Sequence, residues 1–199
     1  MGSRGSGFSE YGTPRAVNSF FGVGSGGVYD VWENEITTGE KENVYDYTGS
    51  AYEWMNESLR KDEVGYLSDS ERMKLENVAA AISKFELKRG ITVYRNSTEH
   101  LIGGYTTPEQ INQNLKGAIV QDKGYMSTTP LKSKTNGFFG EIRYEIKVPK
   151  GKGRGAWVNP ISHYKNNEWE FLIQRGTRFR VTGAHYDNAG NTVVQLRVL

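Results

Sequence analysis

The sequence of 199 residues contains no cysteine. This absence excludes disulfides, thiolate nucleophiles, cysteine-ligated zinc and iron–sulfur clusters. The three histidines lie far apart in the sequence, which disfavours a metal site. No apolar run approaches the roughly 20 residues that a membrane-spanning helix needs, and the N-terminal residues lack the apolar stretch of a signal peptide. We therefore expect a soluble chain without a metal.

An excess of charge of one sign is also missing. The chain has 25 Lys and Arg residues against 23 Asp and Glu residues, a formal net charge of +2. Bulk electrostatic binding to nucleic acid or anionic lipid would require a strong basic excess. The composition therefore predicts no membrane and makes nucleic acid an unexpected partner, and any partner should be recognised locally. The 12 Tyr, 8 Phe and 4 Trp residues supply enough aromatic volume for a core.

Glycine-rich sequence occupies the N-terminal part of the chain. The first 27 residues hold eight glycines and few clustered apolar residues, which predicts a flexible leader. Residues 22–27 satisfy the dinucleotide pattern G-x-G-x-x-G, which requires a strand before it and a helix after it. Residues 28–32 are β-prone rather than helical, so a glycine linker is the favoured interpretation. We expect a Gly-rich leader of unknown role over residues 1–45 and a folded domain over residues 46–199.

Helical spacing of apolar residues begins after residue 48. Residues 50–59 show it first. Ser68 and Glu71 then form a capping box before a second helical stripe, which we expect to stop at Gly90. A short third helix is predicted after Thr107, with proline at its first position.

The apolar period changes to two after Gly117. The change is clearest in residues 141–148, whose even-numbered positions are apolar, so one face of that strand should be solvent-exposed. Helices first and strands later predict an α+β fold with a mostly antiparallel sheet. The other predicted strands cover residues 91–95, 118–121, 125–128, 156–158, 170–173, 177–182 and 192–198.

Two glutamates near the C-terminus are candidates for chemistry. Glu168 and Glu170 enter a predicted strand, where alternate side chains share a face roughly 6.5 to 7 Å apart and Trp169 turns towards the core. Two carboxylates in one cleft repel each other and raise at least one pKa, a cost that acid/base sites accept. The alternative is a solvated strand edge facing Arg178 and Arg180, and the local pattern alone favours that alternative.

Two earlier strands end in polar groups. An apolar run ends in Arg95, whose planar guanidinium suits a phosphate or a carboxylate. A second strand ends in the hydroxyls of Ser127, Thr128 and Thr129, which could orient a carboxylate. Taken alone, Arg95 more often closes a strand with a surface ion pair, and Ser and Thr are common in strands.

The order of these three features resembles the arginine, Ser-Thr-Ser, Glu-x-Glu signature of mono-ADP-ribosyltransferases of the bacterial toxin class, which are related to the enzymatic components of clostridial binary toxins. The resemblance extends from about Thr48 to Val181. Thr129 departs from it, because the family often has a second Ser there. The matching segments are residues 48–50, 91–95, 146–151, 155–158, 168–173 and 175–181.

This resemblance implies N-terminal helices packed on a two-sheet β core, with residues 46–199 as the catalytic domain. It implies that NAD is a substrate, that nicotinamide is released, and that no metal takes part. Glu170 would stabilise the ribose cation, which develops much as in glycoside hydrolysis, and Ser127 would hold that carboxylate. Glu168 would orient and help deprotonate the attacking nitrogen, and its planar pairing with a guanidinium makes a protein arginine the expected acceptor.

The resemblance also implies binding residues. Arg95 would bind the pyrophosphate, with Asn96 and Thr128 as further NAD contacts. Phe138, or its neighbour, would pack on the nicotinamide, and Arg143 is the provisional second phosphate-binding arginine.

Tyr164 lies in a polar turn that resembles the family's target-recognition loop. The alternative for this residue is an ordinary turn aromatic. The basic residues 150–155 could form a phosphate nest, although a solvated turn is favoured.

By resemblance, the protein is a toxin or effector of bacterial or phage origin, secreted or delivered, that modifies a target protein in a host cytosol. Two alternatives remain open from the sequence. One is an NAD glycohydrolase, in which water is the acceptor, and the other is a non-catalytic interaction module with the same fold.

Overall fold

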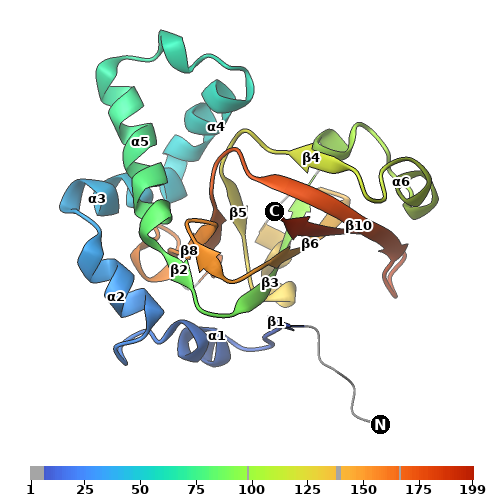
Figure 1. The fold of residues 1–199 in the computed structure, drawn as a ribbon, viewed down its shortest axis with the longest axis horizontal. Helices are drawn as coiled ribbons and strands as arrows, with labels where there is room; N and C mark the ends of the chain where they lie inside the picture. The colour runs from blue at the N-terminus through green and yellow to red at the C-terminus, as the bar shows by residue number, and fades with distance from the viewer. Residues whose placement is uncertain (1–6, 98, 138–139, 166) are drawn as a thin grey trace.

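A computed structural model describes residues 7–97, 99–137, 140–165 and 167–199. Helices from the N-terminal part cover one side of a β core (Figure 1). The α-helices are α1 (Pro14–Phe21), α2 (Val28–Glu35), α3 (Thr38–Asp46), α4 (Tyr52–Arg60), α5 (Asp69–Lys84) and α6 (Pro108–Asn114). A π-helix, η1 (Tyr47–Ala51), joins α3 to α4, and four 3₁₀ helices are η2 (Val64–Tyr66), η3 (Glu99–Ile102), η4 (Lys132–Gly137) and η5 (Asn159–Ile161).

The strands form a large sheet, a small sheet and a two-stranded ribbon. The large sheet has the order β1-β3-β6-β11-β10-β4, the small one β5-β9-β8, and the ribbon β2-β7. Among the described pairings, only β1 with β3 and β6 with β11 are parallel, so the predicted α+β fold with a mostly antiparallel core is confirmed. The strands are β1 (Phe8–Ser9), β2 (Glu86–Leu87), β3 (Gly90–Ser97), β4 (Ile119–Gln121), β5 (Met126–Thr128), β6 (Ile142–Val148), β7 (Gly151–Lys152), β8 (Gly155–Trp157), β9 (Phe171–Ile173), β10 (Arg178–Tyr186) and β11 (Thr192–Val198).

A pair of backbone hydrogen bonds joins the two sheets. The amide of Tyr94 donates to the carbonyl of Thr129 over 2.7 Å, and the amide of Thr129 donates to the carbonyl of Tyr94 over 2.9 Å. The middle of β3 therefore lies beside the end of β5. Arg95 does not end its strand as predicted, because β3 continues to Ser97, but this junction still brings it close to the hydroxyl residues of β5.

From residue 68 onward, several local sequence signals produced the elements that they predicted. The capping box of Ser68 and Glu71 is formed at the start of α5, and Thr107 and Gln110 form another at α6. Along β6 the even-numbered residues are buried and the odd-numbered ones are partly exposed, as the period of two predicts.

The helix stop predicted at Gly90 is wrong. The helix α5 ends at Lys84, because the backbone of Phe85 is extended and the chain turns into β2. Gly90 instead begins β3, where a Cβ atom would lie 2.8 Å from the ring of Phe8. Its small size thus serves the close pairing of β1 with β3.

The N-terminal region contains helices where the sequence predicted a flexible, glycine-rich leader. Residues 28–32 are helical, not extended, and residues 14–21 form α1 rather than a flexible leader. Phe21 stacks on Trp157 with ring centroids 4.8 Å apart, and the Trp32 indole donates to the carbonyl of Ala81 over 2.7 Å. Burial of these aromatic rings outweighs the weak local preferences. A boundary at residue 45 would fall inside α3.

The G-x-G-x-x-G segment is a tight loop between α1 and α2. Gly22 caps α1 with a left-handed backbone, φ 67°. The amides of Gly24 and Gly26 donate to the carboxylate of Asp30 over 2.9 and 2.7 Å, which lowers the pKa of Asp30. The protein's own carboxylate thus occupies the loop amides, and a helix rather than a strand precedes them. Both observations favour the linker interpretation over a phosphate loop.

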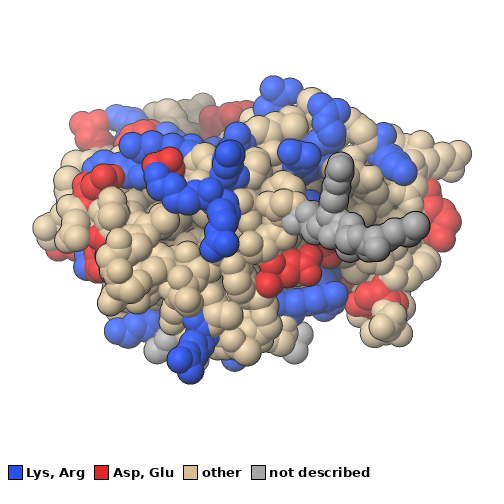
Figure 2. All heavy atoms as spheres, turned by 60° about the horizontal axis from the view of Figure 1, so that its bottom comes forward, with Lys and Arg blue, Asp and Glu red and all other residues tan. Residues whose placement is uncertain are grey.

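Surface charge is not evenly spread. On the lower face of Figure 1, turned forward in Figure 2, Lys and Arg side chains gather with few carboxylates among them. In the part of the chain that the structure describes, no helix is long and apolar enough to cross a membrane.

Candidate active site

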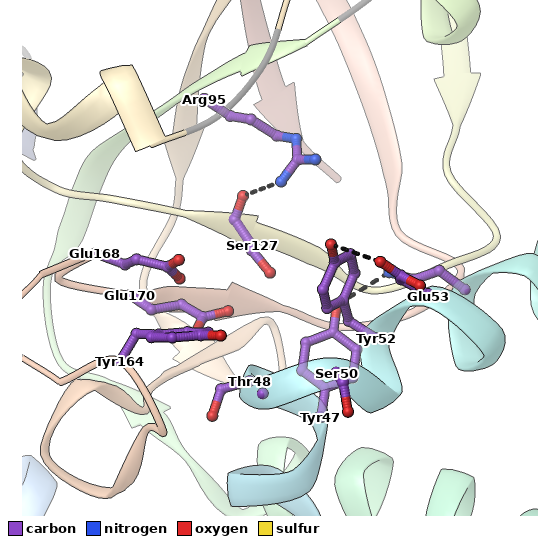
Figure 3. A pocket seen from close by; sticks show the side chains of 12 residues that line it. Tyr47, Thr48, Ser50, Tyr52, Glu53, Arg95, Ser127, Tyr164, Glu168 and Glu170 are labelled. Carbon is purple, nitrogen blue, oxygen red and sulfur yellow. Dashed lines mark hydrogen bonds between the residues drawn. The ribbon is translucent and has the colours of Figure 1, made fainter.

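A cavity of about 520 Å³ lies between the π-helix, α4 and the junction of β3 with β5 (Figure 3). Its volume falls within the range of roughly 300 to 1,000 Å³ that is usual for small-molecule sites. The lining combines aromatic rings with carboxylates, hydroxyls and one arginine. The residues are Tyr47, Thr48, Gly49, Ser50, Tyr52, Glu53, Asn56, Arg95, Ser127, Tyr164, Glu168 and Glu170.

Glu170 forms the floor of this cavity. Its side chain is 1% exposed, and burial raises its pKa to about 7, with the nearby Glu168 adding to the rise. The Ser127 hydroxyl and the more distant charge of Arg95 act in the opposite direction and lower that pKa. The Oε2 atom of Glu170 has no hydrogen-bond partner among the described residues. A buried carboxylate with one unsatisfied oxygen is placed to receive a hydrogen bond or a positive charge from a ligand.

Buried polar side chains lie behind Glu170. The Asn56 amide donates to the Tyr47 hydroxyl over 3.1 Å, while the carbonyl oxygen of Asn56 accepts from the backbone amide of Tyr125 over 2.8 Å. Burial raises the pKa of Tyr47, and the charge of Glu170 adds to the rise. The Ser127 hydroxyl lowers the pKa of both Tyr47 and Glu170, so it faces both groups as a donor.

Arg95 lies at the other end of the cavity. Its Nη1 atom donates to the backbone carbonyl of Ser127 over 2.8 Å, so the junction of β3 with β5 fixes the guanidinium. Burial lowers its pKa, although a guanidinium stays charged at physiological pH. The structure therefore brings together the predicted arginine, the first predicted hydroxyl and the predicted glutamate pair.

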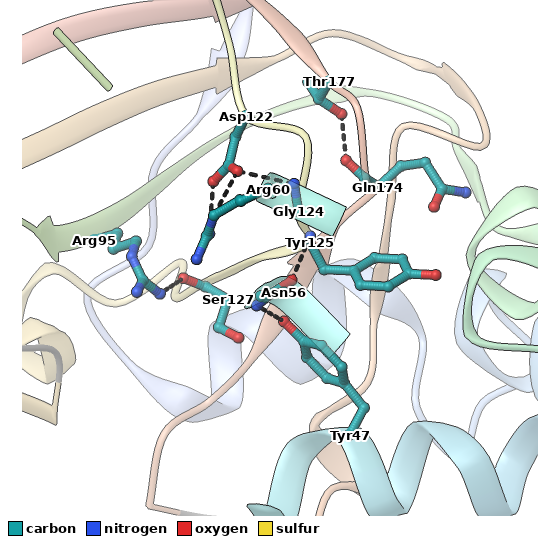
Figure 4. A network of polar contacts seen from close by, with 10 residues as sticks. All are labelled: Tyr47, Asn56, Arg60, Arg95, Asp122, Gly124, Tyr125, Ser127, Gln174 and Thr177. Carbon is teal, nitrogen blue, oxygen red and sulfur yellow. Dashed lines mark hydrogen bonds and ion pairs between the residues drawn. The ribbon is translucent and has the colours of Figure 1, made fainter. Parts of the chain in front are cut away.

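Arg60 is a second arginine near Arg95, and no sequence pattern predicted it at the site. Arg60, at the end of α4, forms a bidentate ion pair with Asp122, with both contacts at 2.9 Å (Figure 4). Asp122 also accepts from the amide of Gly124 over 2.9 Å. Arg60 is close enough to lower the pKa of Arg95 electrostatically. Its partner is 62 residues away in sequence, so no local pattern marked it.

Arg143, the provisional second phosphate-binding arginine, lies elsewhere. It pairs with Asp187 at 3.2 Å and contacts Asn96 at 3.4 Å. Asn96 follows Arg95 on β3, so its side chain points to the opposite face of the sheet. Neither Arg143 nor Asn96 lines the cavity.

Thr128, a predicted NAD contact, does not line the cavity. The Thr128 hydroxyl is buried and donates to the carbonyl of Phe171 over 2.6 Å, so it joins β5 to β9 instead of lining the cavity. Phe138 and Phe139 lie outside the described residues. The NAD contacts predicted for Asn96, Thr128 and Phe138 stay predictions.

The strand predicted through Glu168 is wrong in detail. The strand β9 begins only at Phe171, and Trp169 has a left-handed backbone with φ 52°. Trp169 is buried in the core, as predicted. Its unusual backbone still lets Glu168 and Glu170 line one cavity, although they do not follow the alternation of a regular strand. Burial raises the pKa of Glu168, and the charge of Arg95 opposes that rise.

The mouth of the cavity is aromatic and more open. Tyr52 is 44% exposed and Tyr164 is 43% exposed, and they lie at its rim. The loop that carries Tyr164 is attached to the π-helix, because the amide of His163 donates to the Thr48 hydroxyl over 2.9 Å.

No group of three or more His, Cys, Asp or Glu side chains that could hold a metal ion occurs within residues 7–97, 99–137, 140–165 and 167–199. The polar groups of the cavity are instead two acids, an arginine and hydroxyls. This set suits an organic ligand that carries both phosphate and sugar hydroxyls.

Comparison with known proteins identifies relatives. The chain is 27% identical over 161 residues to the NAD(+)–arginine ADP-ribosyltransferase EFV of Enterococcus faecalis, which covers 76% of this chain and 30% of that protein. It is 25% identical over 160 residues to the putative NAD(+)–arginine ADP-ribosyltransferase Vis of Vibrio splendidus, covering 74% of this chain and 59% of that protein. The chain thus spans between about a third and three fifths of these relatives.

A solved structure covers nearly the whole chain. The ADP-ribosyltransferase toxin Plx2a of Paenibacillus larvae has 25% sequence identity and a TM-score of 0.80, with 96% of this chain and 98% of that chain covered. The model of the ADP-ribosyltransferase exoenzyme family, whose substrate is NAD, matches residues 27–198. The resemblance predicted from the sequence is confirmed. The chain therefore belongs to the ADP-ribosyltransferase exoenzyme family.

Proposed function

We propose that the protein transfers ADP-ribose from NAD to an arginine side chain of a target protein and releases nicotinamide. The observation that carries this proposal is the arrangement of its two acids: Glu170 is buried with an unpaired oxygen, and Glu168 lies nearer the mouth of the same cavity. One acid is placed for the sugar and the other for the acceptor.

Binding of NAD would use the cationic end of the cavity. Arg95 offers a fixed guanidinium in the cavity lining. Arg60 lies behind that lining, paired with Asp122, but its charge is close enough to lower the pKa of Arg95. Two guanidinium groups suit the two phosphates of NAD, since each can form paired hydrogen bonds with phosphate oxygens. We assign Arg60, in place of Arg143, as the second phosphate-binding arginine.

Cleavage breaks the bond between C1′ of the ribose and the nicotinamide nitrogen. The electron pair leaves with nicotinamide, which becomes neutral, and the positive charge develops on the ribose. The Glu170 carboxylate would accept a hydrogen bond from a ribose hydroxyl and stabilise that charge. In a dry cavity such stabilisation is stronger than in water, because little solvent screens it. Ser127 and Tyr47 keep the carboxylate in position.

The acceptor would enter at the mouth of the cavity. Glu168 can pair with a guanidinium through two parallel hydrogen bonds and take a proton from it as the nitrogen bonds to C1′. The exposed rings of Tyr52 and Tyr164 offer faces on which a guanidinium can stack. Both relatives are named as NAD(+)–arginine ADP-ribosyltransferases, which supports this choice of acceptor.

The relatives also support a role in toxicity towards another cell. The structural neighbour Plx2a is described as a toxin. We propose that this protein is likewise secreted or delivered and that its arginine acceptor belongs to a host protein.

The test is to incubate the purified protein with isotope-labelled NAD and a host-cell lysate. Mass spectrometry should locate ADP-ribose on an arginine of a lysate protein. Release of nicotinamide and free ADP-ribose without labelled protein would show an NAD glycohydrolase instead. Calorimetry without any heat of NAD binding would show a non-catalytic module.

A further inference from the structure

A second concave site shares no lining residue with the catalytic cavity, and its charged lining residues are basic instead of mainly acidic. A groove of about 700 Å³ runs beside β1, and Phe8 lies in its wall. Its basic lining residues are Lys88 and Arg89 before β3, Lys150 after β6 and Arg197 on β11. Lys147 on β6 does not line the groove itself but lies over the ring of Phe8 in its wall. We call this region the cationic groove and define it by Lys88, Arg89, Lys147, Lys150 and Arg197.

The positive charges of the cationic groove are mostly uncompensated. Lys88 pairs with Glu86 at 2.6 Å. Lys147, Lys150 and Arg197 have no ion pair with any residue that the structure describes. The sequence contributes to this imbalance, because residues 146–167 contain five Lys or Arg residues and no Asp or Glu. The net charge of +2 for the whole chain conceals this local excess.

Two of these cations repel each other by their position in the sheet. Arg197 on β11 is the direct register partner of Lys147 on β6. Like charges on neighbouring strands in this position destabilise a sheet. Both side chains lie over the Phe8 ring, at 5.6 and 5.8 Å from its centroid, which offsets part of that repulsion. An anionic partner would remove the rest.

The shape of the groove and the state of its aromatic rings indicate what kind of anion fits. The ring of Phe8 is already covered by two cations, and Arg89 covers Phe20 at 5.3 Å. These rings are therefore not available for stacking with nucleic acid bases. A flat bilayer would meet the rim of a concave groove, whereas an extended peptide can enter it and reach both walls.

We propose that the cationic groove binds an acidic segment of a partner protein, with Asp or Glu carboxylates paired to Arg89, Lys147 and Arg197. Arginine offers planar, two-point recognition of carboxylates, which fits a peptide rich in acidic side chains. The proposal does not depend on the proposed enzymatic function, because none of the groove residues lines the catalytic cavity.

The test measures fluorescence anisotropy of a labelled peptide of alternating Glu and Gly on the full-length protein. The control peptide has Gln at each Glu position. We expect binding of the acidic peptide only, weakened at high salt because exposed charges are screened. The double variant Lys147→Glu/Arg197→Glu should lose at least about tenfold in affinity.

A matched variant separates the groove from net charge. Lys116→Glu/Lys132→Glu changes the net charge equally at two exposed lysines that do not line the groove, and it should bind the peptide nearly as well as the wild type. A third double variant, Lys147→Gln/Arg197→Gln, removes the charges without introducing acids and should also weaken binding. It replaces the charge-reversed groove variant if that protein does not fold. Nicotinamide release from NAD should be unchanged in all three double variants.

Three results would overturn the proposal. The first is failure of the acidic peptide to bind at low salt, and the second is an equal loss of affinity in the two charge-reversed variants. The third result is tighter binding, through the same residues, of phosphatidylserine vesicles or of a single-stranded oligonucleotide than of the peptide. That outcome would assign the groove to a membrane or to nucleic acid.

Discussion

The floor and the mouth of the catalytic cavity differ in how their polar groups are held. At the floor, Glu170, Tyr47 and Asn56 are buried, Asn56 hydrogen-bonds Tyr47, and Ser127 lowers the pKa of both Tyr47 and Glu170. At the mouth, Tyr52 and Tyr164 are exposed, and Tyr164 lies on a loop attached through the His163 amide. A fixed, dry floor favours stabilisation of a charge that develops in one place. An open mouth favours contact with a large acceptor. We therefore expect that NAD cleavage and acceptor choice can be altered separately by mutation.

The largest expected effect is at the floor. Glu170→Gln removes the charge that opposes the ribose cation, and we expect NAD cleavage to fall roughly a thousandfold. Nicotinamide release measured by chromatography checks this. Asp187→Asn is the matched control, because Asp187 pairs with Arg143 outside the cavity, and it should keep most of the activity. Activity of Glu170→Gln near that of the control would contradict the role of the floor.

The next effect concerns the chain behind Glu170. Tyr47→Phe replaces the buried phenol beside Ser127 and Glu170 with an apolar ring, so the surroundings of the carboxylate become less polar and the pKa of Glu170 should rise. NAD cleavage requires the ionised carboxylate. We therefore expect the acidic limb of the kcat/KM profile, near pH 7 in the wild type, to move to higher pH. At neutral pH the rate should fall about tenfold.

Tyr125→Phe is the control for this experiment. The Tyr125 hydroxyl is also buried and donates to the carbonyl of Leu75 over 2.7 Å. Its loss should lower stability by a similar amount, about 1 to 3 kcal/mol. Its pH profile should stay at the wild-type position. Equal shifts in both variants would reduce the role of Tyr47 to packing.

A smaller effect is expected at the mouth. Tyr164→Ala should raise the KM for a protein acceptor about fivefold, which corresponds to a loss of about 1 kcal/mol of contact energy. Hydrolysis of NAD without acceptor should not change. Initial rates at varied acceptor concentration give the result, and a parallel loss of both reactions would show that the mouth is not separate from the floor.

The smallest expected effect is on the stability of the fold, through the ionisation of Glu170 at the floor of the cavity. The pKa of Glu170 is higher in the folded protein, about 7, than the ordinary value of 4.5, so the folded state binds the proton more tightly. Folding is therefore favoured at low pH and loses roughly 3 kcal/mol as the pH rises through the interval between these values. Thermal unfolding should show Glu170→Gln gaining stability over the wild type at pH 8 and little at pH 4. A constant difference at both values would argue against a buried, titrating carboxylate.

Much of the fold could be predicted from the sequence because its signals are local. The capping box of Ser68 and Glu71 and the alternation in β6 depend on residues a few positions apart. The helix α3 has the same signal in Thr37 and Glu40, which was present in the sequence and missed. Helix α2 could not be predicted this way, since burial of Trp32 decides it.

The site was predictable to the extent that neighbouring strands carry its groups. Arg95 lies within β3, Ser127 lies within β5 and the two glutamates precede β9, and the order of these strands marked them. Arg60 could not be found, because only the tertiary pairing with Asp122 shows its place. The left-handed backbone of Trp169 was equally hidden, since alternation in sequence assumes a regular strand.

The central claim is that Glu170 acts on NAD while Glu168 acts on the acceptor. The most direct test uses Glu168→Gln and measures released nicotinamide and arginine-linked ADP-ribose in the same reaction. We expect linked ADP-ribose to fall about a hundredfold while nicotinamide release continues, because only deprotonation of the incoming guanidinium is lost. An equal fall in both products would contradict the claim.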